Sequence, residues 1–330
     1  MINPSHPLFF RSILDTLSES NEIRVTVRKR GETIHLARQF GIKGTAIGKD
    51  YEEPVKKTLA IASRAMDLFF RAPKFDVALS FENPMSVAVS RMRMKRSILM
   101  LDNDLKYKIK GNVIQSIESR VKKSASNIVV PLVCKDTFGR HIKGSRLRFY
   151  DGYKEDIYIA DHSPDKDFYS KVPFDEYYVI RPEAFASFYV KRSESLVEPL
   201  LERLSREGLK VVFLPRDRSD WNIEGGENIF IPNKPLDGLD LIYHSRGVLT
   251  GSGTMAREAA VMGRKAVSFF PSDALLTVDQ DLVTRGHLVH SRNVDEIMDH
   301  IINGKERPPP NESGRVKEEV LGILLDLIGE

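Results

Sequence analysis

The stretch Gly251-Ser252-Gly253-Thr254 combines residue types that can bind a phosphate group. Val248-Leu249-Thr250 before it predicts the end of a buried strand, and the residues after it predict a helix that ends at Gly263. The N–H groups in the first turn of a helix lack intrahelical acceptors, and the helix dipole favours negative charge there. Because Gly251 and Gly253 have no Cβ, the backbone can approach an anion closely at this turn.

Glu258 lies one turn into the predicted helix. A carboxylate at that position can accept hydrogen bonds from vicinal hydroxyls, such as those of a ribose. A small-residue turn before a helix is also common in α/β proteins, and this spacing is neither G-x-G-x-x-G nor a P-loop. From the spacing alone, a phosphate site and a purely structural turn both stay open.

The stretch resembles the C-terminal-domain signature of GT-B-type enzymes, the superfamily of glycosyltransferases and UDP-N-acetylglucosamine 2-epimerases. In that superfamily a Ser-Gly-Gly/Thr turn holds the diphosphate and a Glu, here matched by Glu258, holds the ribose. The chain also resembles an archaeal-type, prokaryotic family of unknown function within the superfamily. Three segments carry this likeness: Asn3-Pro-Ser-His-Pro-Leu-Phe-Phe10, Arg28-Lys-Arg-Gly-Glu-Thr33 and the Gly251 stretch.

Apolar runs alternate with amphipathic segments along the whole chain, which predicts βαβ units and a parallel sheet in each half. Predicted strands of the first half are 22–27, 44–48, 76–81, 97–101, 127–130 and 146–149, and its helices are 6–17, 31–40, 51–72 and one from 84. Predicted strands of the second half are 177–180, 210–214, 229–231, 248–250 and 265–270, and its helices include 193–207 and 320–328.

The resemblance implies a GT-B-like α/β fold, in which two doubly wound, Rossmann-like domains with parallel sheets face a cleft and a C-terminal helix crosses back. The expected domains are residues 1–160 on the acceptor side and 177–310 on the nucleotide-sugar side, with 311–330 as the returning helix. Residues 151–176 contain Gly152, Pro164 and Pro173 and predict an interdomain connection, whose core is the linker 161–176.

The composition is that of a globular protein of 330 residues, with 41% hydrophobic and 29% charged residues and a net charge of +4. That charge is too small to indicate nucleic-acid binding. A single cysteine, Cys134, excludes an internal disulfide and a cysteine-based metal site. Without a membrane-spanning run or a signal-peptide pattern, we expect a cytoplasmic protein of undetermined oligomeric state. The basic run Arg91-Met-Arg-Met-Lys-Arg96 predicts a solvated helix end, with peripheral contact to anionic lipid as the alternative.

Three residues are candidate catalytic acids or bases. Asp102 and Asp104 follow the predicted strand 97–101, at the sheet edge where such folds bind ligands, although helix capping would also explain them. His6 follows the first turn of the chain, where an N-terminal cap is the alternative. Only Met1-Ile2 precede that turn, whereas relatives carry several apolar residues upstream, so the first strand is shortened or the start lies further upstream.

On the second half, Arg181 and Arg216 each follow a predicted strand, and arginine binds diphosphates bidentately. A surface ion pair is the alternative for each. Gln280, within Asp279-Gln-Asp281, resembles the glutamine of a loop that reads sugar hydroxyls in some GT-B transferases, and a helix N-cap is the alternative.

The resemblance implies binding of a nucleotide-diphosphate sugar, without a cofactor and without a metal site, and sugar transfer to an unknown acceptor. In that reaction the helix N-terminus at Gly253 and Thr254 would stabilise the leaving diphosphate, and an N-domain base would deprotonate the acceptor. Epimerisation at C2 is the alternative. The epimerases carry His-Arg-x-Glu-Asn where this chain has Ile180-Arg-Pro-Glu-Ala184, which counts against that chemistry. Nucleotide-sugar binding without catalysis is the third hypothesis.

Overall fold

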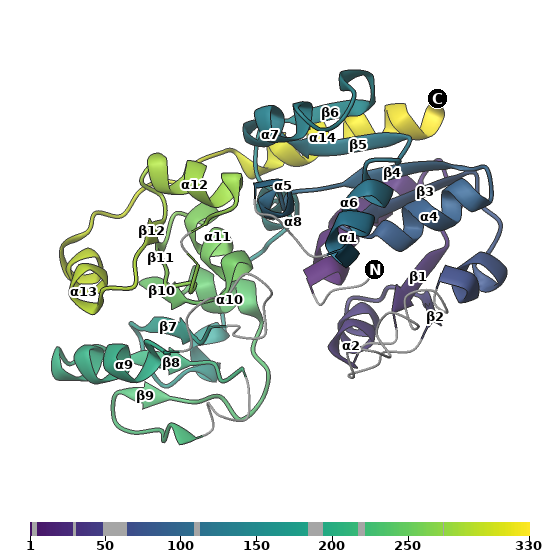
Figure 1. The fold of residues 1–330 in the computed structure, drawn as a ribbon. Helices are drawn as coiled ribbons and strands as arrows, with labels where there is room; N and C mark the ends of the chain where they lie inside the picture. Colours follow the sequence, from purple (N-terminus) through teal and green to yellow (C-terminus); the bar gives the residue numbers. More distant parts are fainter. Residues whose placement is uncertain are drawn as a thin grey trace. The chain divides into compact units, whose positions relative to one another are not determined.

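The computed structural model describes residues 1, 5–28, 31–48, 65–108, 113–183, 194–216, 222–272 and 274–330. By internal contacts the chain divides into two compact units, Met1–Asp161 with Ser313–Glu330, and His162–Glu312 (Figure 1). Predictions on Asn3, Pro4, residues 29–30, most of the helix 51–72, and residue 184 lie outside the described residues.

All strand pairs formed by the described residues of the first unit are parallel. Its strands are β1 (Val25–Arg28), β2 (Gly44–Ile47), β3 (Val77–Phe81), β4 (Arg96–Met100), β5 (Asn127–Pro131) and β6 (Leu147–Tyr150). Its helices are α1 (Ser5–Ser18), α2 (Gly31–Gln39), α4 (Pro84–Met92), α5 (Leu105–Lys108), α6 (Val113–Lys122), α7 (Lys135–Gly139), α8 (Lys154–Ile159) and α14 (Ser313–Gly329).

The described strands of this unit form two sheets, with orders β1-β2 and β3-β4-β5-β6. The prediction of one continuous sheet is therefore wrong for the described residues. The physical reason is that no described strand pairs with both β1 and β3. Met1 lies alongside β1: its ammonium donates to Thr26 O at 2.7 Å, and its carbonyl accepts from Arg28 N at 3.0 Å.

The C-terminal helix α14 packs on α8, α1 and β6 of the first unit (Figure 1). Gly152 allows this contact, because a Cβ there would lie 2.5 Å from Val316 Cγ1. Arg96 donates to Leu327 O and Ile328 O, both at 3.0 Å, and so caps the end of α14. The predicted return of the last helix is confirmed. The predicted connection 151–176 contains α8, a helix too short to show helical periodicity.

The second unit is built on one parallel sheet in the order β12-β11-β10-β7-β8-β9. Its strands are β7 (Tyr178–Arg181), β8 (Val211–Phe213), β9 (Ile229–Phe230), β10 (Gly247–Thr250), β11 (Lys265–Ser268) and β12 (Val289–His290). Its helices are α9 (Val197–Arg206), α10 (Gly238–Tyr243), α11 (Gly253–Val261), α12 (Thr277–Thr284) and α13 (Val294–Asn303).

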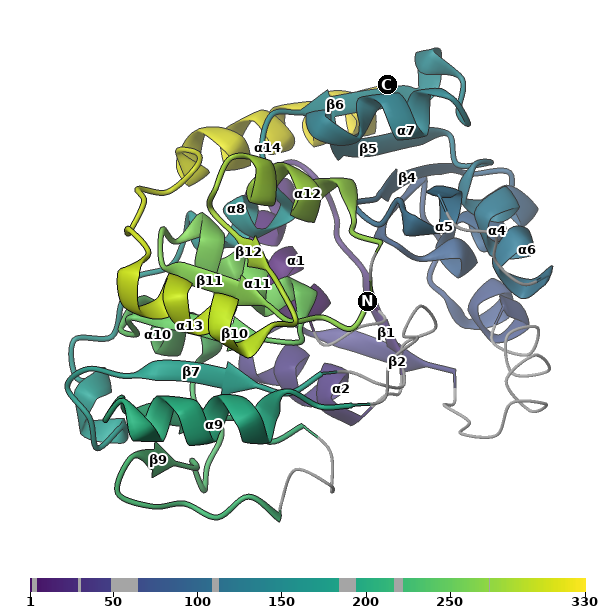
Figure 2. The same cartoon turned by 60° about the vertical axis from the view of Figure 1, so that its left-hand side comes forward.

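Helices cover both faces of this sheet, as expected for a parallel sheet. One face packs on α9 and α13 around a core that includes Ile180, Leu249 and Val267 (Figure 2). The alternate positions Val179 and Val248 are equally buried and belong to the opposite face, because successive strand side chains point to opposite sides. Helix α11 contacts β10 and β11 but contributes no residue to the core formed with α9 and α13, so it covers the face of the sheet opposite to those two helices.

Candidate functional site

The turn between β10 and α11 presents an uncapped helix N-terminus. Ser252 occupies the N-cap position in an extended conformation, and its side chain makes no capping hydrogen bond. Its own N–H donates to Thr250 Oγ1 at 2.9 Å, and the first helical bond runs from Ala256 N to Ser252 O at 3.0 Å. The N–H groups of the first turn, which begins at Gly253 and Thr254, are therefore oriented to bind an anion.

The absence of a Cβ has a different physical consequence at each of the two glycines of this turn. A Cβ on Gly251 would lie 2.4 Å from Glu183 Cα, so the backbone after β7 packs directly against this residue. A Cβ on Gly253 would meet only Arg257 Nη1, at 3.3 Å. Close approach at Gly251 thus serves contact within the protein, while Gly253 leaves its side of the turn accessible.

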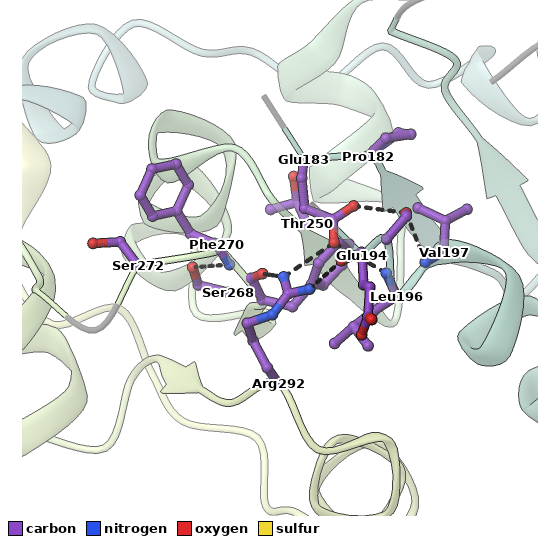
Figure 3. Close-up of polar contacts among 12 residues, drawn as sticks. Pro182, Glu183, Glu194, Leu196, Val197, Thr250, Ser268, Phe270, Ser272 and Arg292 are labelled. Carbon is purple, nitrogen blue, oxygen red and sulfur yellow. Dashed lines mark hydrogen bonds and ion pairs between the residues drawn. The ribbon is translucent and has the colours of Figure 1, made fainter. Parts of the chain in front are cut away.

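Glu183 is a buried residue whose contacts link strand ends of this unit. In the sequence it was considered only as part of the stretch Ile180–Ala184. Its carboxylate accepts from Ser195 Oγ and Leu196 N, both at 3.0 Å, and pairs with Arg292 Nη1 at 3.1 Å (Figure 3). Arg292 also donates to Phe269 O at 2.6 Å. The segment beneath Gly251 is therefore fixed by an ion pair and two hydrogen bonds.

Arg181 ends β7 beside the turn, since its carbonyl accepts from Gly251 N at 3.0 Å. Along β7, Arg181 follows Ile180, whose side chain packs in the core formed with α9 and α13. Because successive strand side chains point to opposite faces, the Arg181 side chain lies on the face of the sheet that α11 covers. Its Nε is buried and has no hydrogen-bond partner among the described residues. Arg216 Nη1 donates to Pro182 O at 3.3 Å, so both predicted arginines adjoin the segment that supports Gly251.

Glu258 is half-buried and follows Thr254 by four residues, which places both on one side of α11. The preceding Arg257, which the sequence analysis did not select, is buried and pairs with Asp279 at 2.8 Å between Nη1 and Oδ1. Gln280 lies in the first turn of α12 and is exposed. Asp279 therefore bridges α11 and α12, and Gln280 has no comparable contact within the described residues.

In the first unit, two of the three catalytic candidates lie in one buried cluster. His6, at the start of α1, is 3% exposed, and its ring meets the Phe81 ring edge-on with 5.6 Å between centroids. Asp102, directly after β4, is also buried, and its Oδ2 is 3.1 Å from Lys154 Nζ on α8. Asp102 and Lys154 both influence the charge state of His6. The sequence analysis missed Lys154 because it lay in the segment predicted to be a connection.

Burial, reinforced by the Met1 ammonium and Lys154, lowers the pKa of His6 to about 3. His6 is therefore neutral at pH 7 and a weak proton acceptor. Its contacts with Phe81 and with Phe10, 6.3 Å between centroids, are those of a packed core side chain.

Asp104 is fully buried and pairs with Lys108 at 3.1 Å between Oδ2 and Nζ. The residue between the two aspartates, Asn103, accepts from Leu105 N at 3.3 Å and so performs the capping that was the alternative for this segment. Glu82, at the end of the neighbouring strand, accepts from Asp102 N at 3.3 Å and Asn103 N at 3.1 Å. Its other oxygen pairs with Lys122 of α6.

The basic run 91–96 is not a uniformly solvated helix end. The Arg93 guanidinium donates to Ala72 O at 2.9 Å and Pro73 O at 2.8 Å, at the end of the helical residues 65–71. Arg96 caps α14, and Lys95 pairs with Asp76 at 2.9 Å. The prediction holds for the exposed Arg91 and fails for Arg93 and Arg96, because the folded chain brings other helix ends against them.

One group in the second unit has the donor set of a cation site: His162, Asp237 and Asp240 offer ligand atoms within 4.8 Å of one another. Each already has a role. Asp237 caps α10 by accepting from Leu239 N at 2.9 Å, and Asp240 Oδ1 accepts from Asp165 N and contacts His162 Nε2, both at 3.0 Å. These contacts account for the grouping without an ion.

Comparison with solved structures identifies the fold. The UDP-GlcNAc 2-epimerase of Methanocaldococcus jannaschii, in complex with UDP-GlcNAc and UDP, matches with a TM-score of 0.74 at 15% identity, covering 97% of this chain and 96% of that one. The glycotransferase of kitacinnamycin matches with a TM-score of 0.57 at 12% identity, covering 98% and 94%. The predicted GT-B-like fold with two parallel-sheet α/β domains is confirmed.

The chain belongs to the family described as "Protein of unknown function (DUF354)", which matches residues 1–329. A relative, the uncharacterised protein MJ0665 of M. jannaschii, is 21% identical over 310 residues, covering 91% of this chain and 89% of that protein. The predicted family is confirmed. Within the described part of the chain, no helix has the length and apolar character needed to cross a membrane.

Proposed function

We propose that this protein binds a nucleoside diphosphate sugar through its second unit and transfers the sugar to a hydroxyl acceptor. The observation that carries the proposal is the uncapped N-terminus of α11 beside Arg181, whose buried Nε has no partner among the described residues. A helix N-terminus and a guanidinium favour the same ligand, an anion with several oxygen atoms.

The roles of the neighbouring residues follow from this arrangement. The N–H groups that begin at Gly253 and Thr254 bind the diphosphate, Ser252 and Gly251 shape the turn, and Arg181 with Arg216 neutralises its charge. Glu258, on the same side of α11 as Thr254, accepts hydrogen bonds from the ribose hydroxyls. The charge that develops on the leaving diphosphate is then stabilised by preorganised N–H groups and arginines, in place of a metal ion.

The fold supports this function, because the matched M. jannaschii epimerase is described in complex with UDP-GlcNAc and UDP. Epimerisation at C2 is the second candidate, favoured by the carboxylates Glu82, Asp102 and Glu155, which lie close together in the first unit. Against it, the epimerase histidine is replaced by Ile180, which is fully buried in an apolar core. Sugar transfer therefore ranks first.

The first test is thermal unfolding with UDP, GDP, dTDP and CMP sugars. A ligand at about one hundred times its dissociation constant adds roughly 2.7 kcal/mol to the free energy of unfolding. We expect a clear shift with one nucleotide, and loss of most of that shift in Glu258→Ala. The absence of a shift with every nucleotide contradicts the proposal, and an unchanged shift in Glu258→Ala contradicts the ribose assignment.

The second test separates the candidate reactions with the nucleotide sugar that binds. Release of free nucleoside diphosphate, with the sugar incorporated into an acceptor, supports transfer. Solvent deuterium at C2 of the recovered sugar supports epimerisation. Binding with neither result leaves a nucleotide-sugar-binding protein without catalysis.

A further inference from the structure

Two segments of the first unit meet at the C-terminal end of α4. Arg93, the C-cap of this helix, donates through its guanidinium to Pro73 O at 2.8 Å. Leu68 belongs to the same core cluster as Val89 of α4. The helical residues 65–71 therefore lie beside α4, and these contacts hold the chain after them against the turn that leads into β4 (Figures 1 and 2).

The outward side of these two segments carries the most exposed large apolar side chains among the described residues. Phe70 is 71% exposed and Met94 is 93% exposed, and Met66 and Met92 are about half exposed. Four of the nine exposed large apolar side chains of the described residues thus belong to these two segments. Single exposed apolar residues are ordinary on protein surfaces, whereas a group of them marks an interaction surface.

Met94 adopts a strained backbone conformation at this surface. Its φ of 55° lies in the left-handed region, directly after the C-cap of α4, where helices usually have glycine. Met94 N donates to Arg91 O at 3.1 Å and Lys95 N donates to Ser90 O at 2.8 Å, which is the Schellman pattern that ends a helix. Because the Met94 side chain is almost fully exposed, packing within the protein does not offset the strain. A strained and exposed apolar residue points to a contact outside this chain.

Positive charge accompanies these apolar side chains. Residues 65–76 and 91–96 contain six cations and two carboxylates, while the net charge of the whole chain is only +4. Of the two carboxylates, Asp67 is half-buried and Asp76 pairs with Lys95 at 2.9 Å. Four of the cations are exposed: Arg71, Lys74, Arg91 and Lys95. The surface therefore combines exposed apolar side chains with an excess of exposed cations.

We propose that this surface docks on an anionic lipid bilayer. The α4-end surface, as we call it, consists of Phe70, Met92 and Met94 with Arg71, Arg91 and Lys95. Its apolar side chains enter the boundary between headgroups and acyl chains, and its cations bind the lipid phosphates. Methionine suits this role, because its flexible side chain adapts to a disordered apolar environment.

The composition of the α4-end surface favours a bilayer over other anionic partners. A nucleic acid would pair with the cations but would leave the methionines in water. A bilayer with anionic headgroups satisfies the cations and the apolar side chains together. The inference goes beyond the proposed sugar transfer, because it involves residues of the first unit alone and needs no nucleotide sugar.

Sedimentation of the full chain with large unilamellar vesicles tests the proposal. We expect binding to vesicles made of equal parts of phosphatidylcholine and phosphatidylglycerol, and little binding to vesicles of phosphatidylcholine alone. Charge attraction is screened over about 3 Å at about 1 M salt, so salt at that concentration should release most of the bound protein.

Two double variants separate the apolar and the charged contributions. Phe70→Ser/Met94→Gly removes the two most exposed apolar side chains, and Arg91→Gln/Lys95→Gln removes two exposed cations. We expect each variant to weaken binding to the anionic vesicles by about tenfold or more. Both should fold, because the replaced side chains are exposed and glycine relieves the strain at position 94. Circular dichroism and urea unfolding check this.

Matched controls remove the same kinds of side chain elsewhere. Leu132→Ser/Ile302→Ser replaces two apolar residues that are 42% and 50% exposed. Lys166→Gln/Arg206→Gln replaces two exposed cations of the second unit. We expect both controls to bind the anionic vesicles as the parent does.

The proposal is overturned if the parent does not bind the anionic vesicles, or if either α4-end variant binds them as tightly as the parent. A parent that ignores vesicles but forms a dimer that Phe70→Ser/Met94→Gly dissociates also overturns it, and assigns the surface to a second copy of this chain. Loss of binding in the controls as well would show that the α4-end surface is not the docking site. Failure of the nucleotide-sugar tests leaves these outcomes unchanged, so the two proposals stand or fall separately.

Discussion

Gly251 and Gly253 are two residues apart, yet substitution by alanine should have opposite effects on stability. A Cβ on Gly251 would lie 2.4 Å from Glu183 Cα, 2.7 Å from Glu183 Cγ and 2.7 Å from Glu183 N. Carbon atoms attract one another at about 3.5–4.0 Å, so each of these contacts is strongly repulsive. Glu183 cannot move away easily, because Arg292 and Leu196 N hold its carboxylate.

The strain in Gly251→Ala therefore falls on the backbone. Overpacking a well-packed site costs about 1–3 kcal/mol, and we expect the upper end of that range because the obstacle is main chain. In Gly253→Ala the new methyl group meets only the end of the Arg257 side chain, at 3.3 Å. Alanine is favoured over glycine in a helix by roughly 0.5–1 kcal/mol, so this variant should match or exceed the parent in stability.

Urea unfolding followed by circular dichroism measures both free energies of unfolding under the same conditions. A difference between the two variants below about 0.5 kcal/mol would refute the steric argument, since the structure gives a difference of at least 1 kcal/mol. The same samples test the ligand site. Displacement of the turn in Gly251→Ala should weaken nucleotide-sugar binding relative to the parent even where the protein is folded.

Three further predictions follow from single features of the structure. Met94 has a φ of 55°, in the left-handed region, so Met94→Gly should raise the free energy of unfolding by about 1 kcal/mol in a urea titration. Arg292→Met leaves a buried carboxylate without its cation and should lower stability by about 3–5 kcal/mol, and adding Glu183→Gln should restore part of the loss. The pKa of His6 is lowered from 6.5 to about 3. Between these two pH values the unfolded state binds one more proton than the folded state, so the free energy of unfolding falls as the pH falls through this range. His6→Phe should lessen that fall, by up to about 1.4 kcal/mol per pH unit, and an identical acid unfolding curve would contradict the burial argument.

The location of the turn between β10 and α11 could be predicted because strand, turn and helix are contiguous in sequence. Glycine, serine and threonine between an apolar run and a helical segment fix the local geometry. The reason for Gly251 could not be predicted, because its neighbour Glu183 is 68 positions earlier and is brought close only by the pairing of β7 with β10. Gln280 was suggested by a short motif; it lies exposed on α12, and its role stays a prediction.

Asp102 was a candidate because it directly follows a recognisable strand. Its partner Lys154 lies 52 residues later in a segment with turn residues, and no pattern in that segment distinguishes a buried cation from a solvated one. The same limit applies to Arg93 and Arg96. Their positions at a helix end were visible, but the carbonyl groups that they cap belong to other segments.

The sequence by itself determined the alternation of strands and helices, the parallel class of the sheets and the glycine turn before α11, because these depend on local periodicity and on turn residues. The return of the last helix was implied by the resemblance to GT-B-type enzymes. Only the tertiary structure decided that the described strands of the first unit form two sheets, that Glu183 and Arg292 support the turn, and that Lys154 lies between Asp102 and Glu155. Strand pairing and burial of charge depend on contacts between residues far apart in the chain. Such contacts leave no periodic signal in a single sequence.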